Sequence, residues 1–179
     1  MPKIDIKGYF AWKDSMKVTA AAITTGWYAG QCFKVSDGSG DDLSHDEVAL
    51  QTSAGGLVYG IAMESSSEAS SAVAGMNIPS SSKVTILHGH SKFEINHKAE
   101  VVAGSSVRAY AADVATADQG ALLYSDAGGK LTTTPNAVSG SMVPGSQITA
   151  GPTLILPVGY ITKVPTLANN YTLGLILFG

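Results

Sequence analysis

The sequence predicts an all-β protein: a single β-barrel or β-sandwich domain with long loops and an N-terminal arm. Short apolar runs recur through the 179 residues, 20 glycines and 7 prolines punctuate them, and few stretches have the 3.6-residue period of a helix. This pattern is typical of barrels and sandwiches. We assign residues 1–22 to an arm or edge strand and residues 23–179 to the β-domain, because the first clear core strand begins at Trp27.

The N-terminal stretch alternates and then concentrates aromatic residues. Ile4 and Ile6 fall on one side of a short extended segment. Tyr9, Phe10 and Trp12 follow closely, although aromatic residues make up only 7% of the chain. Because Trp and Tyr are common interface anchors, we expect these three side chains to contact a neighbouring molecule. The alternative is that they close the end of their own barrel.

Core strands and loops alternate through the next eighty residues. Strands are expected at residues 27–35, 48–52, 57–63, 84–88 and 93–95, and a loop at residues 36–42. Residues 64–76 are expected to form either a weak helix or a mobile surface loop. The apolar phase shifts at Gly89, which predicts a bulge or a bend at that position.

The stretch 101–135 is the scaffold around which we expect the other strands to be organised. Val107, Ala109 and Ala111 alternate with polar residues as in a half-buried strand. Two further strands, at residues 122–124 and 131–134, flank a glycine-containing turn and predict a hairpin. After a polar connection at 136–151, strands are expected at 154–161 and 171–178. The last is apolar on both faces, which predicts a buried inner strand.

The chain also resembles itself at three places. Residues 29–35 resemble 103–107, residues 58–61 resemble 158–161, and residues 83–87 resemble 171–175. The spacings differ, so the pattern is not a solenoid repeat. It indicates two similar groups of strands that pack face to face.

Composition and charge exclude several classes of function. Charged residues make up 14% of the chain, against roughly 25% in typical soluble proteins. Covering such a surface with a partner therefore costs little hydration free energy. The net charge of −3 argues against a nucleic-acid partner. The single Cys32 has no internal disulfide partner and reads as a buried, inert thiol. No apolar run has the length of a signal peptide or a membrane span, so we expect a soluble protein made in the cytosol, with no membrane partner.

Two groups of candidate metal ligands are weak. His88 and His90 lie on one face of an expected strand, and a bulge could bring His97 to the same face. They have neither a cysteine partner nor a carboxylate at a suitable spacing, so hydrogen-bonded strand residues are the better interpretation. The loop 37–42 is rich in Asp and Gly but lacks the distal Glu of a calcium loop. We therefore expect neither a metal nor a cofactor.

The sequence contains no credible catalytic site. It has no Gly-x-Ser-x-Gly elbow, and Asp46 and Glu47 are adjacent, so on a strand they point to opposite faces. We therefore expect a protein that is not an enzyme. A carbohydrate-binding domain would need an exposed aromatic platform, for which Trp27–Tyr28 or Phe10–Trp12 are the candidates.

Several glycine and strand motifs together carry a family resemblance. They lie at Ala29–Gln31, Val58–Ala62, Val84–Gly89 with Phe93–Ile95, Val102–Ser105, Tyr124–Thr134, Pro157–Ile161 and Leu173–Phe178. In this layout, from Gly26 to Gly179, the chain resembles the capsid decoration, or structural cement, proteins of tailed bacteriophages. It departs from them by an insert at residues 113–120 and by long loops at 65–82 and 136–152.

The resemblance implies a non-enzymatic virion protein of β-barrel or β-sandwich fold. Such a protein binds the major capsid protein on the outer surface of the assembled head, often as a homotrimer, and strengthens the shell. We expect it on the capsid exterior after assembly in the host cytoplasm. The alternative is a sugar-binding β-domain of a head fibre or another receptor-binding virion protein.

Overall fold

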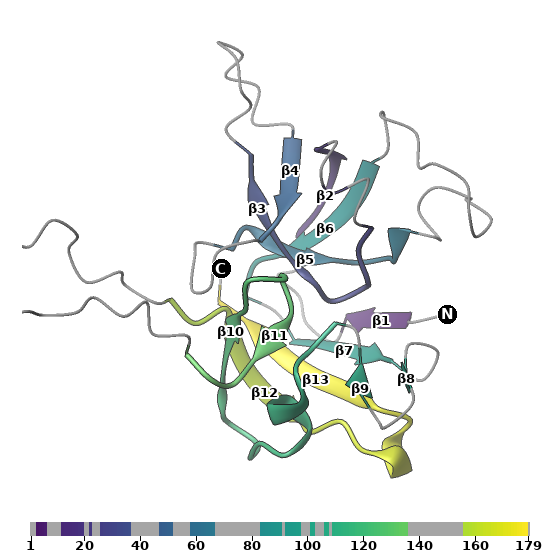
Figure 1. The fold of residues 1–179 in the computed structure, drawn as a ribbon, viewed down its shortest axis with the longest axis vertical. Coiled ribbons are helices and arrows are strands. Elements are labelled where there is room, and N and C mark those ends of the chain that lie inside the picture. Colours follow the sequence, from purple (N-terminus) through teal and green to yellow (C-terminus); the bar gives the residue numbers. More distant parts are fainter. Residues whose placement is uncertain are drawn as a thin grey trace, which may run out of the picture.

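The protein is all-β in its computed structural model, with a closed five-stranded barrel and a second, six-stranded sheet (Figure 1). The structure describes residues 3–6, 12–19, 22, 26–36, 47–51, 58–66, 83–90, 92–97, 101–102, 106–107, 109–135 and 156–178. None of the helices among these residues has the length and apolar character needed to cross a membrane.

Five strands of the first half of the chain close the barrel. They are β2 (Trp12–Val18), β3 (Cys32–Val35), β4 (Glu47–Leu50), β5 (Gly60–Ala62) and β6 (Lys83–His88), in the order β2-β4-β3-β5-β6. β6 pairs with β2 and so completes the ring. β2 and β4 are parallel, and the other neighbours are antiparallel.

The second sheet combines the first strand of the chain with strands from its second half. Its members are β1 (Lys3–Ile6), β7 (Lys92–Asn96), β13 (Thr172–Leu177), β12 (Gly159–Lys163), β10 (Leu122–Ser125) and β11 (Leu131–Thr132), in that order and all antiparallel. β8 (Val101–Val102) and β9 (Ser106–Val107) form a separate pair, and the described residues include short 3₁₀ helices at Ala112–Ala115 and Leu167–Asn169.

The wall formed by β3, β5 and β6 is shared by two hydrophobic cores. Residues that alternate inward, such as Phe33 and Ile86, fill the barrel with Trp27, whose ring meets that of Phe33 edge-on at 6.0 Å. Their neighbours Cys32, Ile61 and Leu87 point outward and pack on the second sheet. Each fully buried aliphatic or aromatic side chain is worth roughly 1.5–3 kcal/mol, so this wall holds the two sheets together.

The internal resemblance corresponds to equivalent strand pairs. Ile61 of β5 pairs with Leu87 of β6, and Ile161 of β12 pairs with Leu175 of β13. All four side chains are buried in the core between the barrel and the second sheet. The two similar strand groups therefore pack face to face.

The N-terminal stretch lies in both sheets. β1 is an edge strand, pairing with β7 from Lys3 opposite Asn96 to Ile6 opposite Phe93. Trp12–Val18, however, is a barrel strand rather than part of an arm, because its inward residues Met16 and Val18 belong to the barrel core. The boundary we placed at residue 22 therefore does not separate an arm from the domain.

Other predicted strands are present but shorter or shifted. The strand at 27–35 is reduced to β3, because the chain turns at Ala29–Gly30, where Gly30 has φ of 91°. The run at 57–63 shortens to β5, and that at 154–161 shifts to β12. The expected strand through Ala111 is wrong beyond Val107: Tyr110 makes a single bridge to Leu131 and a 3₁₀ helix follows.

Two expectations about specific positions are confirmed. Gly89, with φ of 90°, is the bend at which the chain passes from β6 of the barrel to β7 of the second sheet. β13 is an inner strand between β7 and β12, and its residues Leu173, Gly174, Leu175 and Leu177 are buried. Apart from residues 36 and 64–66, the segments predicted at 36–42 and 64–76 lie outside the described residues, as does the connection at 136–151.

Candidate functional site

Three polar side chains meet at the end of the barrel where β2 begins and β6 ends. Asp14 lies in β2, Tyr59 precedes β5 and His88 ends β6. The hydroxyl of Tyr59 donates to Asp14 Oδ2 at 2.5 Å, and His88 Nε2 lies 2.7 Å from the same oxygen. The rings of Tyr59 and His88 stack with their centroids 4.8 Å apart. We call these three residues the barrel-mouth cluster.

The position of the cluster follows from the alternation of β2. Trp12, Asp14, Met16 and Val18 share one face of the strand. Met16 and Val18 are buried in the barrel, Asp14 lies where that core ends, and Trp12 lies beyond it with 64% of its surface exposed. Because Trp12 is directly opposite His88 in the ladder, the indole is on the same face as the cluster.

The cluster holds Asp14 ionised. The hydrogen bond from Tyr59 is the largest influence on the pKa of Asp14 and, with the hydrogen bond and electrostatic attraction of His88, it lowers this pKa against the opposing effect of burial. The same bond to Asp14, followed by burial, raises the pKa of Tyr59 to about 12. Both donors converge on one carboxylate oxygen, an arrangement that fixes the carboxylate rather than activating a nucleophile.

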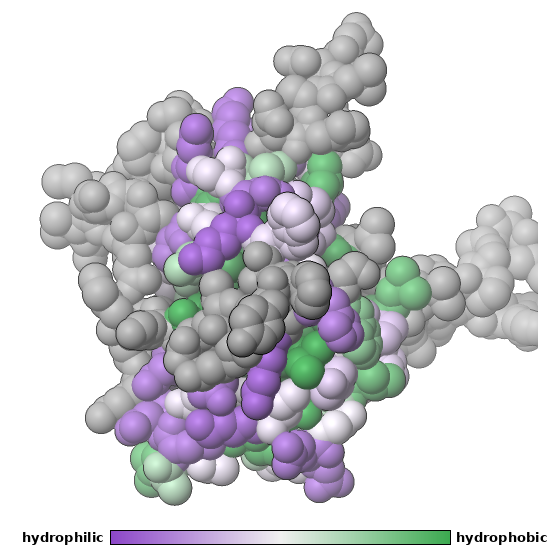
Figure 2. All heavy atoms as spheres, turned by 180° about the vertical axis from the view of Figure 1, so that it is seen from behind, coloured by the Kyte–Doolittle hydropathy of each residue, from purple (hydrophilic) through white to green (hydrophobic). Residues whose placement is uncertain are grey.

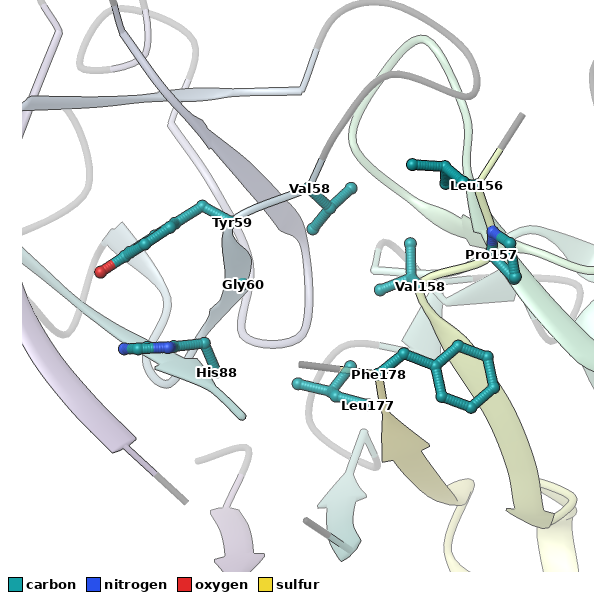
Figure 3. A pocket seen from close by; sticks show the side chains of 9 residues that line it. All are labelled: Val58, Tyr59, Gly60, His88, Leu156, Pro157, Val158, Leu177 and Phe178. Carbon is teal, nitrogen blue, oxygen red and sulfur yellow. The ribbon is translucent and has the colours of Figure 1, made fainter. Parts of the chain in front are cut away.

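A cleft of about 360 Å³ separates the barrel wall from the second sheet (Figure 3). Its lining residues are Val58, Tyr59, Gly60, His88, Leu156, Pro157, Val158, Leu177 and Phe178. In Figure 3 the rings of Tyr59 and His88 lie side by side and point away from Val158 and Leu177. The wall on the second-sheet side is therefore wholly apolar, while the polar ends of the opposite wall reach Asp14.

Exposed apolar side chains continue from the cleft onto the outer face of the second sheet. Leu156 and Phe178 line the cleft and are each 41% exposed. The ring of Phe178 lies 5.8 Å from that of Tyr160, and Tyr160 is opposite Leu122, which is 44% exposed. We call Leu122, Leu156, Tyr160 and Phe178 the apolar strip. Figure 2 shows hydrophobic residues interspersed with hydrophilic ones on the back of the molecule.

The aromatic residues that the sequence suggested for an interface or a sugar platform differ in exposure. Tyr9 and Phe10 lie outside the described residues, and Trp12 is exposed at the start of β2. Trp27 is buried in the barrel core and donates from its indole to the carbonyl of Glu64, so it is no part of an exposed platform. Its neighbour Tyr28 is only half-buried.

The three histidines that we considered as metal ligands have separate surroundings. His88 contacts Asp14 at the barrel mouth, and His90 is exposed beyond the end of β6. His97 follows β7, is buried, and meets the ring of Tyr110 edge-on at 5.0 Å. Within the described part of the chain no three His, Cys, Asp or Glu side chains are grouped as metal ligands would be. The loop 37–42 and Asp46 are outside that part.

Sequence reasoning did not find the barrel-mouth cluster or the apolar strip. Asp14, Tyr59 and His88 are far apart in the chain, and no spacing rule connects them. The one available signal was the polar Asp14 on the face of Met16 and Val18, which marks where the core-facing part of β2 ends. The strip depends on the pairing of β10 with β12, which local sequence does not specify.

No protein-family model matches this chain, and no curated protein or solved structure is significantly similar to it.

Proposed function

We propose that this protein decorates the head of a tailed bacteriophage, binding the major capsid protein on the outer surface and stabilising the shell without catalysis. The apolar strip is the observation that carries the proposal. Leu122, Leu156 and Phe178 keep 41–44% of their surface exposed and lie next to an apolar cleft. Exposed apolar residues grouped in this way are typical of interaction surfaces.

The energetics of the strip suit a repeated contact. Burying a large apolar side chain completely stabilises by roughly 1.5–3 kcal/mol, so each side chain that is already more than half covered contributes about 1 kcal/mol on docking. A single contact of this size is weak. On a shell that presents the same site many times, an oligomer gains strength from simultaneous attachment.

The composition supports the same role. A surface with 14% charged residues loses little hydration when it is covered, and a net charge of −3 gives only weak repulsion between copies. We infer a homotrimer, in which Tyr9 and Phe10 are interface residues toward the capsid or a sister subunit. Trp12, the third aromatic residue expected at an interface from the sequence, is 64% exposed in the protomer and stays accessible in this trimer. Multi-angle light scattering at micromolar concentrations tests this inference, and a monomer throughout would contradict it.

Cosedimentation with undecorated heads tests the proposed function. Heads of the phage whose genome encodes this chain are mixed with the purified protein and pelleted, and bound protein is quantified. We expect saturable binding and a higher temperature of head rupture. The double variant Leu122→Ser and Phe178→Ser should weaken binding about thirtyfold, as expected for the loss of about 2 kcal/mol.

Leu167→Ser is the matched control. Leu167 is 76% exposed but lies in the 3₁₀ helix Leu167–Asn169, outside the strip, so its replacement should leave head binding unchanged. Absence of saturable binding by the folded wild-type protein would refute the decoration role. Equal weakening by Leu167→Ser would refute the assignment of the strip.

A further inference from the structure

We propose that Trp12 and Asp14 form a binding site for a neutral saccharide at the mouth of the barrel. The site is separate from the apolar strip, so the inference does not depend on the decoration role. It rests on an exposed indole, an oriented carboxylate oxygen and the charge around them.

Trp12 supplies an apolar platform. It belongs to β2 and is opposite His88 in the ladder with β6, so its backbone is fixed by the barrel. Nevertheless 64% of the residue is exposed, whereas Met16 and Val18 on the same strand face are buried. A rigidly mounted, exposed indole binds a ligand with little loss of conformational entropy. Its π-face matches the C–H face of a pyranose ring.

Asp14 supplies a fixed hydrogen-bond acceptor two residues along the same face. Tyr59 and His88 both bond Oδ2, which prevents free rotation of the carboxylate. Among the described residues no donor contacts Oδ1, and the side chain is 41% exposed. An ionised carboxylate only accepts hydrogen bonds, so a hydroxyl or N–H group of a ligand can replace the water that Oδ1 otherwise binds. The two halves of the site thus select a molecule with hydroxyl groups beside an apolar face.

The surrounding charges favour a neutral ligand over a cation or an anion. Lys13 and Lys17 lie on the opposite face of β2, because successive residues of a strand point to opposite sides, and Lys17 lies 3.9 Å from Glu47. On the face of the site, His88 lies 2.7 Å from Asp14 Oδ2, so the negative charge that a cationic side chain would meet is already partly compensated. An anionic sugar would be repelled by the carboxylate. A neutral sugar uses the aromatic face and the acceptor without either cost.

Nuclear magnetic resonance can separate binding at this site from a general effect. The chain has two tryptophans, and their indole N–H groups give two signals. The indole of Trp27 is buried and bonded to the carbonyl of Glu64 at 2.9 Å, so it serves as an internal control. The ¹⁵N-labelled protein is titrated with glucose, galactose, mannose, N-acetylglucosamine and their disaccharides, and separately with tetramethylammonium chloride.

We expect at least one saccharide to shift the Trp12 signal saturably, at millimolar concentration, while the Trp27 signal stays in place. Asp14→Asn should weaken binding of this saccharide about tenfold. Asparagine has a single acceptor oxygen, which cannot accept from Tyr59 and His88 and also take the place of Oδ1 toward the sugar. Trp12→Ala should abolish binding as followed by the backbone amides of β2 and β6, and Leu167→Ser should leave it unchanged. Trp12 is exposed, so its replacement leaves the core intact and the test remains valid if Asp14→Asn unfolds.

Three results would overturn the inference: no saturable shift with any saccharide, a shift with tetramethylammonium alone, or undiminished sugar binding by Trp12→Ala. The second result would assign the site to a basic side chain instead. Head binding is measured on the same variants. Retention of head binding by Trp12→Ala separates a failure of this inference from a failure of the decoration role.

Discussion

The carbonyl oxygen of Gly129 accepts a hydrogen bond from the backbone N–H of Cys32 at 2.7 Å, which joins the β10–β11 hairpin to the barrel. Beside it, Gln31 Nε2 donates to the carbonyl of Gly128 at 3.0 Å. The turn is shaped by Asp126, whose Oδ1 accepts from the N–H groups of Gly128 and Lys130. The tip of the hairpin therefore joins the second sheet to the barrel through specific hydrogen bonds.

Replacing Gly129 with alanine should destabilise the protein more than an equivalent change elsewhere. Gly129 has φ of 73°, and an added Cβ would lie 3.0 Å from the carbonyl oxygen of Cys32. The left-handed conformation costs a non-glycine residue about 1–2 kcal/mol, and the crowding adds about 1 kcal/mol. Urea unfolding gives the change in unfolding free energy. Gly120→Ala is the control, because Gly120 has φ of 92° but open space around it. Equal losses at both positions would contradict a docked hairpin.

Asp113 should stabilise the protein in a pH-dependent manner. Burial raises the pKa of Asp113, but hydrogen bonds from Thr132, Thr133 and Thr134 to Oδ2 outweigh it and lower this pKa. Asp113→Asn should cost about 1–3 kcal/mol at neutral pH. Because the folded pKa lies below the value of 3.8 for the unfolded chain, this stabilisation is present above that value and is lost as the pH falls through the folded pKa.

Chemical denaturation at pH 7 and at progressively lower pH checks this prediction. The difference between wild type and Asp113→Asn should shrink on acidification. Asp118→Asn is the control, since Asp118 is exposed and lies just after the same 3₁₀ helix. A difference that is independent of pH would mean that the charge of the Asp113 carboxylate does not strengthen its hydrogen bonds with Thr132, Thr133 and Thr134.

The thiol of Cys32 should react only when the protein opens. Cys32 is fully buried in the shared wall, as expected from the sequence, and burial raises the pKa of its thiol to about 12. The reactive thiolate is therefore scarce and inaccessible. Ellman's reagent should detect no thiol in the native protein and one per chain in concentrated urea. Gly129→Ala should speed labelling about tenfold for each 1.4 kcal/mol of unfolding free energy that it removes. Rapid labelling of the native wild type would contradict the burial.

Removing residues 1–14 should destabilise the fold. The deletion takes away all of β1 and the ladder partners of Ile86, Leu87 and His88 in β2. A dispensable arm would leave thermal stability unchanged, but the loss of an edge strand and part of a barrel strand should lower the melting temperature or prevent folding. The double variant Tyr9→Ser and Phe10→Ser keeps β1 and β2. We expect it to fold normally and to lose head binding, and cosedimentation measures that loss.

The sequence predicted the all-β class because strand alternation and turn chemistry are properties of neighbouring residues. Ile61 and Leu87 read as apolar strand positions, and Gly89 as a bend, from local pattern alone. Strand ends were less predictable. Thr133 and Thr134 continue a β-like run in the sequence, yet they leave the ladder because Asp113 captures their N–H and hydroxyl groups.

Only the tertiary structure decided which segments meet. The sequence singled out Trp12 and His88 for separate reasons, but their meeting with Asp14 and Tyr59 depends on three strands or strand ends that lie far apart in the chain. Alternation determines which face a side chain takes, since backbone geometry repeats every two residues. Which strand lies next to that face is decided by the packing of the two hydrophobic cores as a whole. Residues from both ends of the chain contribute to these cores, so the neighbour of a strand cannot be deduced from local sequence.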